Sequence, residues 1–210
     1  MDRALILETL PPEQRLALAY APARHRDGLL AVLGLDLRLA QVVLGAREPM
    51  LAQIRLAWWR DRLADDAAVI EGEPLLQLVQ DAVLDRAPLR DLVDGWEGLL
   101  GEPAPELAKS LAHARAEAIS YAASRTPVDH AVLTSAREWS LQDLSRIPGP
   151  WGILAGKLAN AEQWQARRLP REQRFLAVLH ALARRSRRSG ATGPGPGSIV
   201  VALRVGLFGR

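Results

Sequence analysis

Two long stretches near the N-terminus carry apolar side chains at the spacing of an α-helix. The first, residues 22–44, is rich in leucine and valine and stops before a glycine. The second, residues 48–66, begins with an acid and Pro49. An acid followed by proline in the first turn is a common start of a helix. The pattern therefore predicts two helices that pack antiparallel and are joined by a tight turn at residues 45–47.

The second of these helices is apolar on two sides. At about 100° per residue, one face carries Met50, Ile54, Ala57 and Trp58 with Leu51 at its edge, and the opposite face carries Ala52, Leu56, Trp59 and Leu63. A helix that is apolar all round is usually buried inside its protein. We therefore expect this helix at the centre of a bundle, with the indoles of both Trp58 and Trp59 mostly buried.

Helical patterning continues along almost the whole chain. Breaks that contain proline and glycine separate further helices, among them segments at about 12–20, 89–100, 106–124 and 171–188. No alternation typical of strands and no internal repeat is visible. The pattern predicts an all-α bundle, divided into a helical domain at 1–188, a Gly/Pro linker at 189–198 and a short apolar tail at 199–210.

The C-terminal segment allows more than one interpretation. Residues 199–208 are apolar except for one arginine, but a membrane span needs about 20 such residues. The tail therefore either docks back onto the bundle or contacts a membrane or a partner. The simplest interpretation of the basic run at 184–188 is a solvated helix end. The second interpretation is a site for an anionic membrane surface. RNA is disfavoured, because no aromatic residues are interleaved with the arginines.

Composition narrows the class of protein further. A chain of 210 residues suits one domain with a sizeable core. The absence of cysteine excludes disulfides, zinc-thiolate sites and cysteine nucleophiles. The N-terminus has no basic segment followed by an apolar one, so no secretory signal is expected. The formal net charge is only +3, and 25 of the 27 basic residues are arginine. We expect a cytoplasmic protein, with peripheral membrane contact through the tail left open, and no nucleic-acid partner.

One segment resembles a known family. It reads Glu48-Pro49-Met50-Leu51, then Ile54-Arg55-Leu56, then Trp58-Trp59-Arg60. This series is similar to the signature of the squalene/phytoene synthase family, in a short, divergent bacterial branch related to the branch of a mitochondrial complex I assembly factor. The resemblance covers residues 15–66 well and fades by about residue 145. It implies an isoprenoid-synthase-like helical bundle, truncated because the usual chain is longer by several helices.

The resemblance also implies a magnesium site that this chain does not reproduce. In the family, two Asp-rich motifs face each other across a cavity and hold Mg²⁺ on the substrate diphosphates, and carboxylates are ligands that suit this ion. Ala40, Gln41 and Leu44 stand where the aspartates of the first motif would be. The second motif does not appear, and Glu162 and Glu172 are the only acids after Asp143. We therefore expect no catalytic and no metal-binding residue, with Mg²⁺ as the cofactor only if the chain is active.

Three carboxylates remain as candidates. Asp36 lies on an apolar helix face, so it requires a charged partner, most simply Arg55 or an arginine of another neighbouring helix. Asp61 and Asp65 have the DxxxD spacing at the end of the second helix. This pair is either a solvated helix end or a relic of a metal site.

Two functional hypotheses follow from the signature and the missing motifs. The first is a divergent family member without the Asp-rich motifs, which binds an isoprenoid or another hydrophobic ligand or acts through a protein partner. The alternative is an active prenyltransferase that condenses two isoprenyl diphosphates. The missing aspartates count against the alternative, because the metal ligands stabilise charge on the departing diphosphate.

Overall fold

The computed structural model describes residues 3–64, 72–124, 129–190 and 196–209. Within these ranges the chain forms eleven α-helices and two short 3₁₀ helices, and no strand occurs. The all-α prediction is confirmed. The α-helices are α1 (Arg3–Thr9), α2 (Pro12–Leu18), α3 (Ala23–Leu44), α4 (Pro49–Ala64), α5 (Pro74–Asp81), α6 (Ala87–Glu97), α7 (Pro105–Ser124), α8 (His130–Leu144), α9 (Pro150–Ala161), α10 (Arg174–Ser189) and α11 (Pro196–Phe208).

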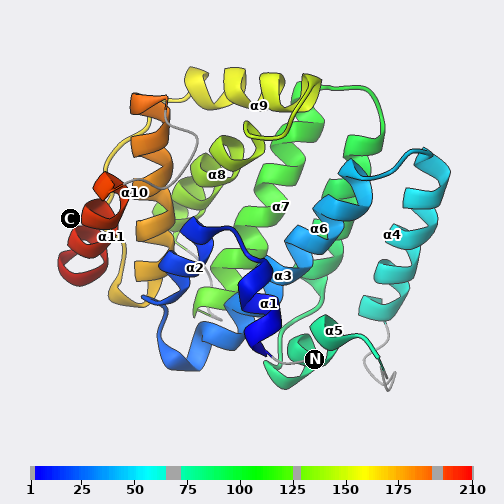
Figure 1. The fold of residues 1–210 in the computed structure, drawn as a ribbon, viewed down its shortest axis with the longest axis horizontal. Coiled ribbons are helices and arrows are strands. Elements are labelled where there is room, and N and C mark those ends of the chain that lie inside the picture. The colour runs from blue at the N-terminus through cyan, green and yellow to red at the C-terminus, as the bar shows by residue number, and fades with distance from the viewer. Residues whose placement is uncertain (1–2, 65–71, 125–128, 191–195, 210) are drawn as a thin grey trace.

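The long helices α3 and α7 form the middle of the bundle (Figure 1). Helix α7 packs against α3, α6, α8 and α9, and α8 packs in turn against α10. Helices α4 and α11 lie at opposite edges of the molecule in Figure 1. One apolar core runs from Ile6 in α1 to Val205 in α11. The packing therefore leaves two helices at the periphery, each with a side that the bundle does not cover.

Proline and side-chain caps define where many of the helices begin. Helices α2, α4, α5, α7 and α9 all begin with proline, whose missing N–H would have no partner in the first turn. The carboxylates of Glu73 and Asp129 accept hydrogen bonds from the first-turn amides of α5 and α8. Before α9, Gly149 has a φ of 90°, which glycine adopts without a steric penalty.

The prediction that both sides of α4 are buried is wrong. Its buried residues are Ala52, Leu56, Trp59 and Leu63. Trp59 is 4% exposed, whereas Trp58 is 40% and Ile54 60% exposed. The reason is the position of α4 at the edge of the bundle, where α3 and α6 are its main neighbours. The second apolar face therefore points outwards.

The C-terminal tail forms a helix that the apolar pattern did not predict. Helix α10 ends at Ser189, Gly190 follows in the left-handed conformation with φ 64°, and α11 starts at residue 196. The helix thus begins within the predicted linker 189–198, of which residues 191–195 lie outside the described ranges. Helix α11 packs against α10 and α2. None of the described helices is both long enough and apolar enough to cross a membrane.

Candidate functional site

A buried ion cluster joins three helices in the interior of the bundle. Arg115 of α7 lies between Asp36 of α3 and Asp143 of α8. Its Nη2 atom is 2.7 Å from Oδ2 of Asp36 and 2.7 Å from Oδ2 of Asp143. Trp96 of α6 donates its indole N–H to Oδ1 of Asp36 at 2.8 Å. Asp36 and Arg115 are both buried, so their charges compensate each other away from water.

All three nitrogens of the Arg115 guanidinium donate hydrogen bonds. Nε donates to the Asp36 carboxylate, and Nη1 donates to the Ser140 carbonyl at 3.3 Å and hydroxyl at 3.2 Å. The guanidinium lies 4.8 Å from the centre of the Trp139 ring. Burial lowers the pKa of Arg115, but the nearby charges of Asp36 and Asp143 more than offset this, and the net effect raises it. Arg115 is therefore a permanent cation within the bundle.

The structure confirms that Asp36 pairs with an arginine of a neighbouring helix and decides between the two alternatives for that partner. Asp36 is buried and paired with an arginine, as its apolar surroundings predicted. The partner is Arg115 and not Arg55, which is exposed on α4. A sequence pattern does not identify this partner, because the two residues are 79 positions apart.

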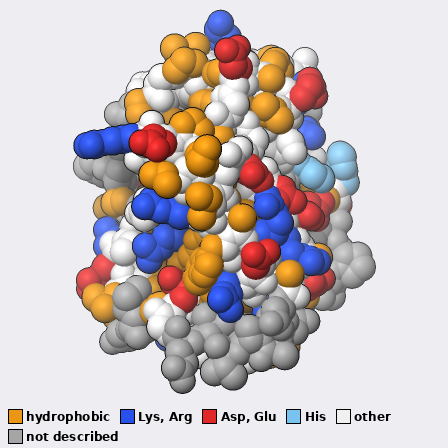
Figure 2. Space-filling view, turned by 90° about the vertical axis from the view of Figure 1, so that its right-hand side faces the viewer, with side chains coloured by type: hydrophobic (Ala, Val, Ile, Leu, Met, Phe, Trp, Pro, Cys, Tyr) orange, Lys and Arg blue, Asp and Glu red, His pale blue; other side chains and the backbone are white. Residues whose placement is uncertain are grey.

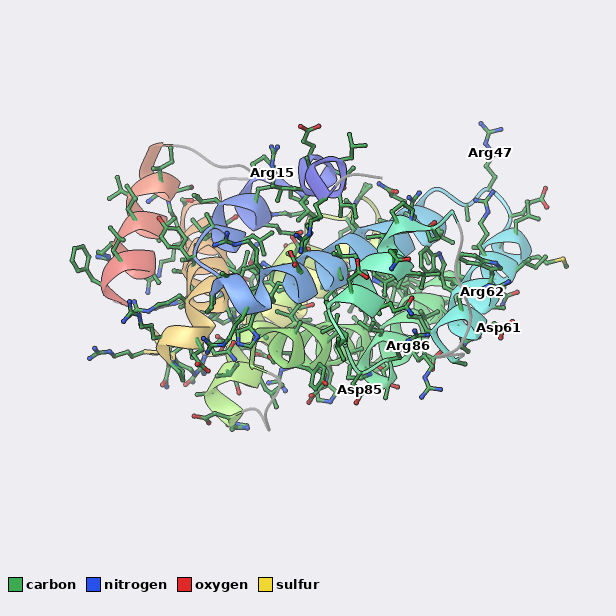
Figure 3. The ribbon with its side chains drawn as sticks, turned by 90° about the horizontal axis from the view of Figure 1, so that it is seen from below. Arg15, Arg47, Asp61, Arg62, Asp85 and Arg86 are labelled. Atoms are coloured by element: carbon green, nitrogen blue, oxygen red, sulfur yellow. The ribbon has the colours of Figure 1, made fainter. Side chains whose placement is uncertain are left out.

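Asp61 does not form a site among the described residues, and neither does the second pair with DxxxD spacing, Asp81 and Asp85. Asp61 is exposed on α4, and Asp65 lies outside the described residues. Figure 3 shows Asp61 beside Arg62 at the surface of the molecule. Asp85 is also exposed and accepts a hydrogen bond from the Ala87 amide at 3.0 Å, at the start of α6. No carboxylate cluster therefore opposes Asp61 across a cavity in this part of the structure.

The signature segment divides into a packing part and a surface part. Arg60 binds Asp94 and Glu97 of α6, and hydrogen bonds to these two acids raise its pKa. Trp59 lies in the core, and Pro49 begins α4. Leu56 is also buried, and the remaining signature residues are exposed, namely Glu48, Met50, Leu51, Ile54, Arg55 and Trp58. Leu56, Trp59 and Arg60 thus anchor α4 to its neighbours, and most of the other signature residues cover its outer side.

The outer side of α4 forms an apolar stripe on the surface. This surface, which we name the α4 face, consists of Met50, Leu51, Ile54 and Trp58. Figure 2, which views this edge of the molecule, shows a column of hydrophobic side chains with basic and acidic groups on either side. Arg62 lies over the Trp58 ring, 5.7 Å from its centre. The two indoles, Trp58 and Trp59, meet edge to face at 5.1 Å between ring centres.

A second buried polar cluster was not predicted from the sequence. Glu138 of α8 lies 2.5 Å from Nε2 of His180 and accepts a hydrogen bond from Arg167 at 2.8 Å. Burial raises the pKa of Glu138, but the hydrogen bonds with His180 and Arg167 lower it by a larger amount. The net effect is a lowered pKa. His180 also stacks on Trp164 at 5.6 Å. The three polar residues share no spacing that a sequence motif would reveal.

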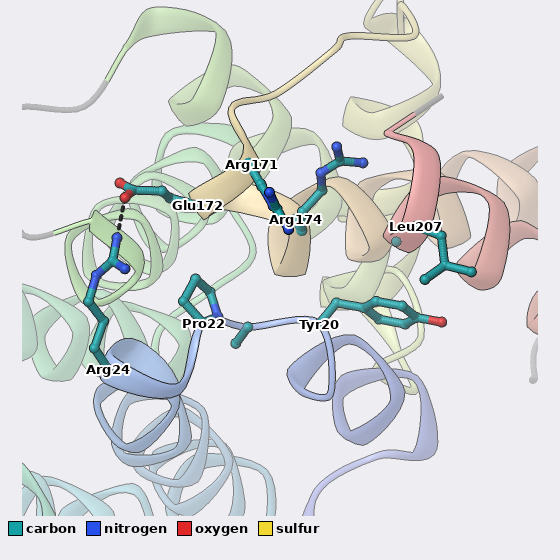
Figure 4. Close-up of a pocket in the computed structure, with 9 residues that line it drawn as sticks. Tyr20, Pro22, Arg24, Arg171, Glu172, Arg174 and Leu207 are labelled. Atoms are coloured by element: carbon teal, nitrogen blue, oxygen red, sulfur yellow. Dashed lines mark hydrogen bonds and ion pairs between the residues drawn. The ribbon is translucent and has the colours of Figure 1, made fainter.

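Two hollows lie beside α11. The larger, of about 830 Å³, is lined by Tyr20, Pro22, Arg24, Arg171, Glu172, Arg174 and Leu207, among others. Figure 4 shows Arg24 paired with Glu172 across it. The smaller hollow, of about 300 Å³, is lined by Ala181, Arg184, Arg185, Arg188, Ser189, Val201 and Arg204. Both hollows are therefore rich in arginine.

Comparison with known proteins identifies the family. The all-α bundle is of the isoprenoid-synthase-like class, with charged residues from three helices meeting in its interior. The family profile of squalene/phytoene synthases matches residues 12–135, which is 124 of 210 residues, and the chain belongs to this family. The match includes the signature segment, Asp36 and Arg115 but ends before Asp143. Neither a curated protein nor a solved structure matches the chain.

The residues that are present do not fit the magnesium ions of the family. Asp36 and Asp143 both bind Arg115, so a guanidinium already lies between these two carboxylates. The described residues contain no group of three or more histidine, aspartate or glutamate side chains placed to hold a metal ion. The hollow beside Asp143 has a volume of about 10 Å³, roughly the space of one water molecule. The donor set therefore favours an internal ion pair over a bound cation.

Proposed function

We propose that this squalene/phytoene synthase family protein does not condense prenyl diphosphates and instead acts by binding a partner protein. The main supporting observation is the Asp36–Arg115–Asp143 cluster. A magnesium-diphosphate site needs carboxylates that are free to bind the ion. In this chain both carboxylates are already bound to a buried arginine with a raised pKa.

The α4 face is the surface that we propose for the partner. Tryptophan, methionine and arginine are enriched in protein interfaces, and this face combines Trp58, Met50 and the overlying Arg62. Exposed charges of both signs border it, including Arg55 and Asp61. A mixed polar rim around an apolar centre is typical of a protein–protein interface. The proposed occupant is therefore a protein that presents an apolar helix or strand with a charged rim of its own.

An incubation with farnesyl and geranylgeranyl diphosphate plus Mg²⁺ tests the absence of condensation. We expect no squalene- or phytoene-like product, with an active member of the family as the positive control. We also expect little thermal stabilisation by Mg²⁺ and diphosphate, because a true ligand at 100 times its Kd would add about 2.7 kcal/mol. Product formation by the purified protein, lost in Asp36→Asn or Asp143→Asn, contradicts the proposal. Strong stabilisation by a prenyl chain alone would favour the alternative of a ligand-binding protein.

Site-specific photo-crosslinking tests the partner. A crosslinker at Ile54 on the α4 face is compared with one at Ile153 on α9, which is similarly exposed. We expect a discrete protein adduct only at position 54, and binding of the purified partner should weaken by about 2 kcal/mol or more in Trp58→Ala. An adduct between two copies of the chain, equal adducts at both positions, or binding unchanged in Trp58→Ala would each contradict the proposal.

A further inference from the structure

The C-terminal helix α11 carries apolar side chains that the bundle does not cover. The helix docks through Ser198, Ala202 and Val205, which are buried. Its other side exposes five large apolar side chains at 47–65% of their surface, namely Ile199, Val200, Leu203, Leu207 and Phe208. We name this surface the tail face. Such a surface costs free energy in water unless something covers it.

Arginine-lined hollows lie on both sides of the tail face. At about 100° per residue, four of the five side chains span one quarter of the helix. Arg204, Phe208 and Val201 follow them on one side, and Gly206 precedes them on the other. Val201 and Arg204 line the smaller hollow, and Gly206 lines the larger one. The larger hollow adds Arg171 and Arg174 to the basic residues of this end of the molecule. The apolar face therefore lies between two basic borders.

The arginines of the smaller hollow form no ion pair within the described part of the chain. Arg184, Arg185, Arg188 and Arg204 line it without any acidic residue, and none of the four pairs with a described carboxylate. The pKa of Arg184 is lowered first by burial and next by the charge of Arg188, while Glu138 partly offsets both. Like charges gathered at one place repel each other, so this cluster does not stabilise the fold. It instead suits an anion supplied from outside.

We propose that the tail face and its arginines form a docking surface for an anionic lipid bilayer. A helix of this kind lies in the plane of the interface, with its apolar side chains at the boundary between headgroups and acyl chains. Arginine side chains reach the headgroup phosphates, to which guanidinium groups bind in a bidentate manner. Anionic lipids attract basic residues at a membrane surface by about 1 kcal/mol each. This inference does not depend on the proposed function, because the α4 face lies at the opposite edge of the molecule (Figure 1).

Other occupants fit the tail face less well. A second copy of the chain, related by a two-fold axis, would bring the same arginines against each other, and like charges across an interface are unfavourable. A nucleic acid would match the charge but leave the five apolar side chains in water. The α4 face differs from the tail face because acids such as Glu48 and Asp61 border it together with arginines.

Vesicle flotation tests the proposal with the full chain. We expect binding to vesicles of phosphatidylcholine with phosphatidylglycerol, and much weaker binding to phosphatidylcholine alone. Added salt should reduce binding to the anionic vesicles, because it screens charges at the surface. Equal binding to both vesicle types, or no binding to either, would overturn the proposal.

A pair of charge variants separates the arginine cluster from net charge. The test variant replaces Arg185, Arg188 and Arg204 with glutamine, and the matched control replaces Arg47, Arg55 and Arg62 of the α4 region with glutamine. All six arginines are exposed, and each triple variant removes three positive charges. We expect the test variant to lose about 100-fold in vesicle partitioning, or about fivefold for each arginine. The control should remain within about twofold, and equal losses in both would contradict the proposal.

A second pair of variants tests the apolar face. The test variant carries Leu203→Ser and Leu207→Ser, and the matched control carries Leu51→Ser and Ile54→Ser on the α4 face. All four side chains are exposed, so both variants should fold, which thermal unfolding checks. We expect vesicle binding to fall at least tenfold in the test variant only. Unchanged vesicle binding in the test variant would overturn the proposal. So would self-association of the natural chain without vesicle binding, if the test variant abolishes that self-association.

Discussion

Arg115 of α7 joins α3 and α8 through ion pairs in the interior of the bundle. It is buried, and its guanidinium contacts both Asp36 and Asp143. Arg115→Met should reduce the free energy of unfolding by about 3–5 kcal/mol, because it leaves the Asp36 carboxylate buried without its partner. Urea unfolding at neutral pH measures the loss. The double variant Arg115→Met with Asp36→Leu should recover part of it, since the isolated charge is then removed. A loss below about 1 kcal/mol in the single variant would contradict this account.

Glu138 gives the stability a specific dependence on pH. The hydrogen bonds with His180 and Arg167 lower its pKa below the ordinary value, despite burial. A carboxyl group with a lowered pKa in the folded state stabilises the protein above its unfolded pKa, and this contribution disappears as pH falls through the folded value. Glu138→Gln should therefore reduce stability at pH 7 by about 1–3 kcal/mol and flatten the acid limb of the stability profile. Urea unfolding from neutral to acidic pH tests this, and parallel profiles would refute it.

At the scale of the helix, the two adjacent tryptophans of α4 differ in burial and should differ in their contribution to stability. Trp59→Ala should cost about 3–5 kcal/mol of unfolding free energy, because it opens a cavity in the core. Trp58→Ala should cost about 1 kcal/mol or less, because its indole is already 40% exposed. Chemical denaturation of both variants measures the difference. Equal losses would mean that α4 is enclosed on both sides after all.

Helix α9 offers a matched pair of glycines. A methyl group on Gly152 would lie 1.8 Å from the Ile147 carbonyl oxygen, whereas one on Gly156 would meet only the Ser145 side chain at 3.6 Å. Gly152→Ala should therefore destabilise the protein by at least about 1–3 kcal/mol. Gly156→Ala should be neutral or stabilising by up to about 1 kcal/mol, since alanine favours the helix. Thermal unfolding distinguishes the two, and similar effects at both positions would show that the turn before α9 relaxes freely.

At the scale of the whole molecule, a continuous core connects the first described helix with the last. We therefore expect one cooperative unfolding transition. Far-UV circular dichroism and tryptophan fluorescence should give the same midpoint, because the six tryptophans are spread from Trp58 to Trp164. An early transition seen only by circular dichroism would show that an end of the chain unfolds separately.

The sequence alone determined the fold class and the signature. Apolar periodicity and proline breaks placed most helices to within a few residues, because both signals act through local backbone geometry. The same periodicity failed for α4. It indicated two apolar faces correctly but not that one of them would lie at the surface. It also missed α11, whose short apolar run follows a glycine- and proline-rich stretch.

Only the tertiary structure decided which charges meet. The apolar surroundings of Asp36 required an arginine, but the choice of Arg115 over Arg55 depends on how α3 and α7 pack. The cluster of Glu138, Arg167 and His180 likewise joins residues that are distant along the chain. Helical periodicity arises from contacts within a few residues, so one chain reveals it. Ion pairs and uncovered faces depend on the relative positions of whole helices, which a single sequence does not encode in any local pattern.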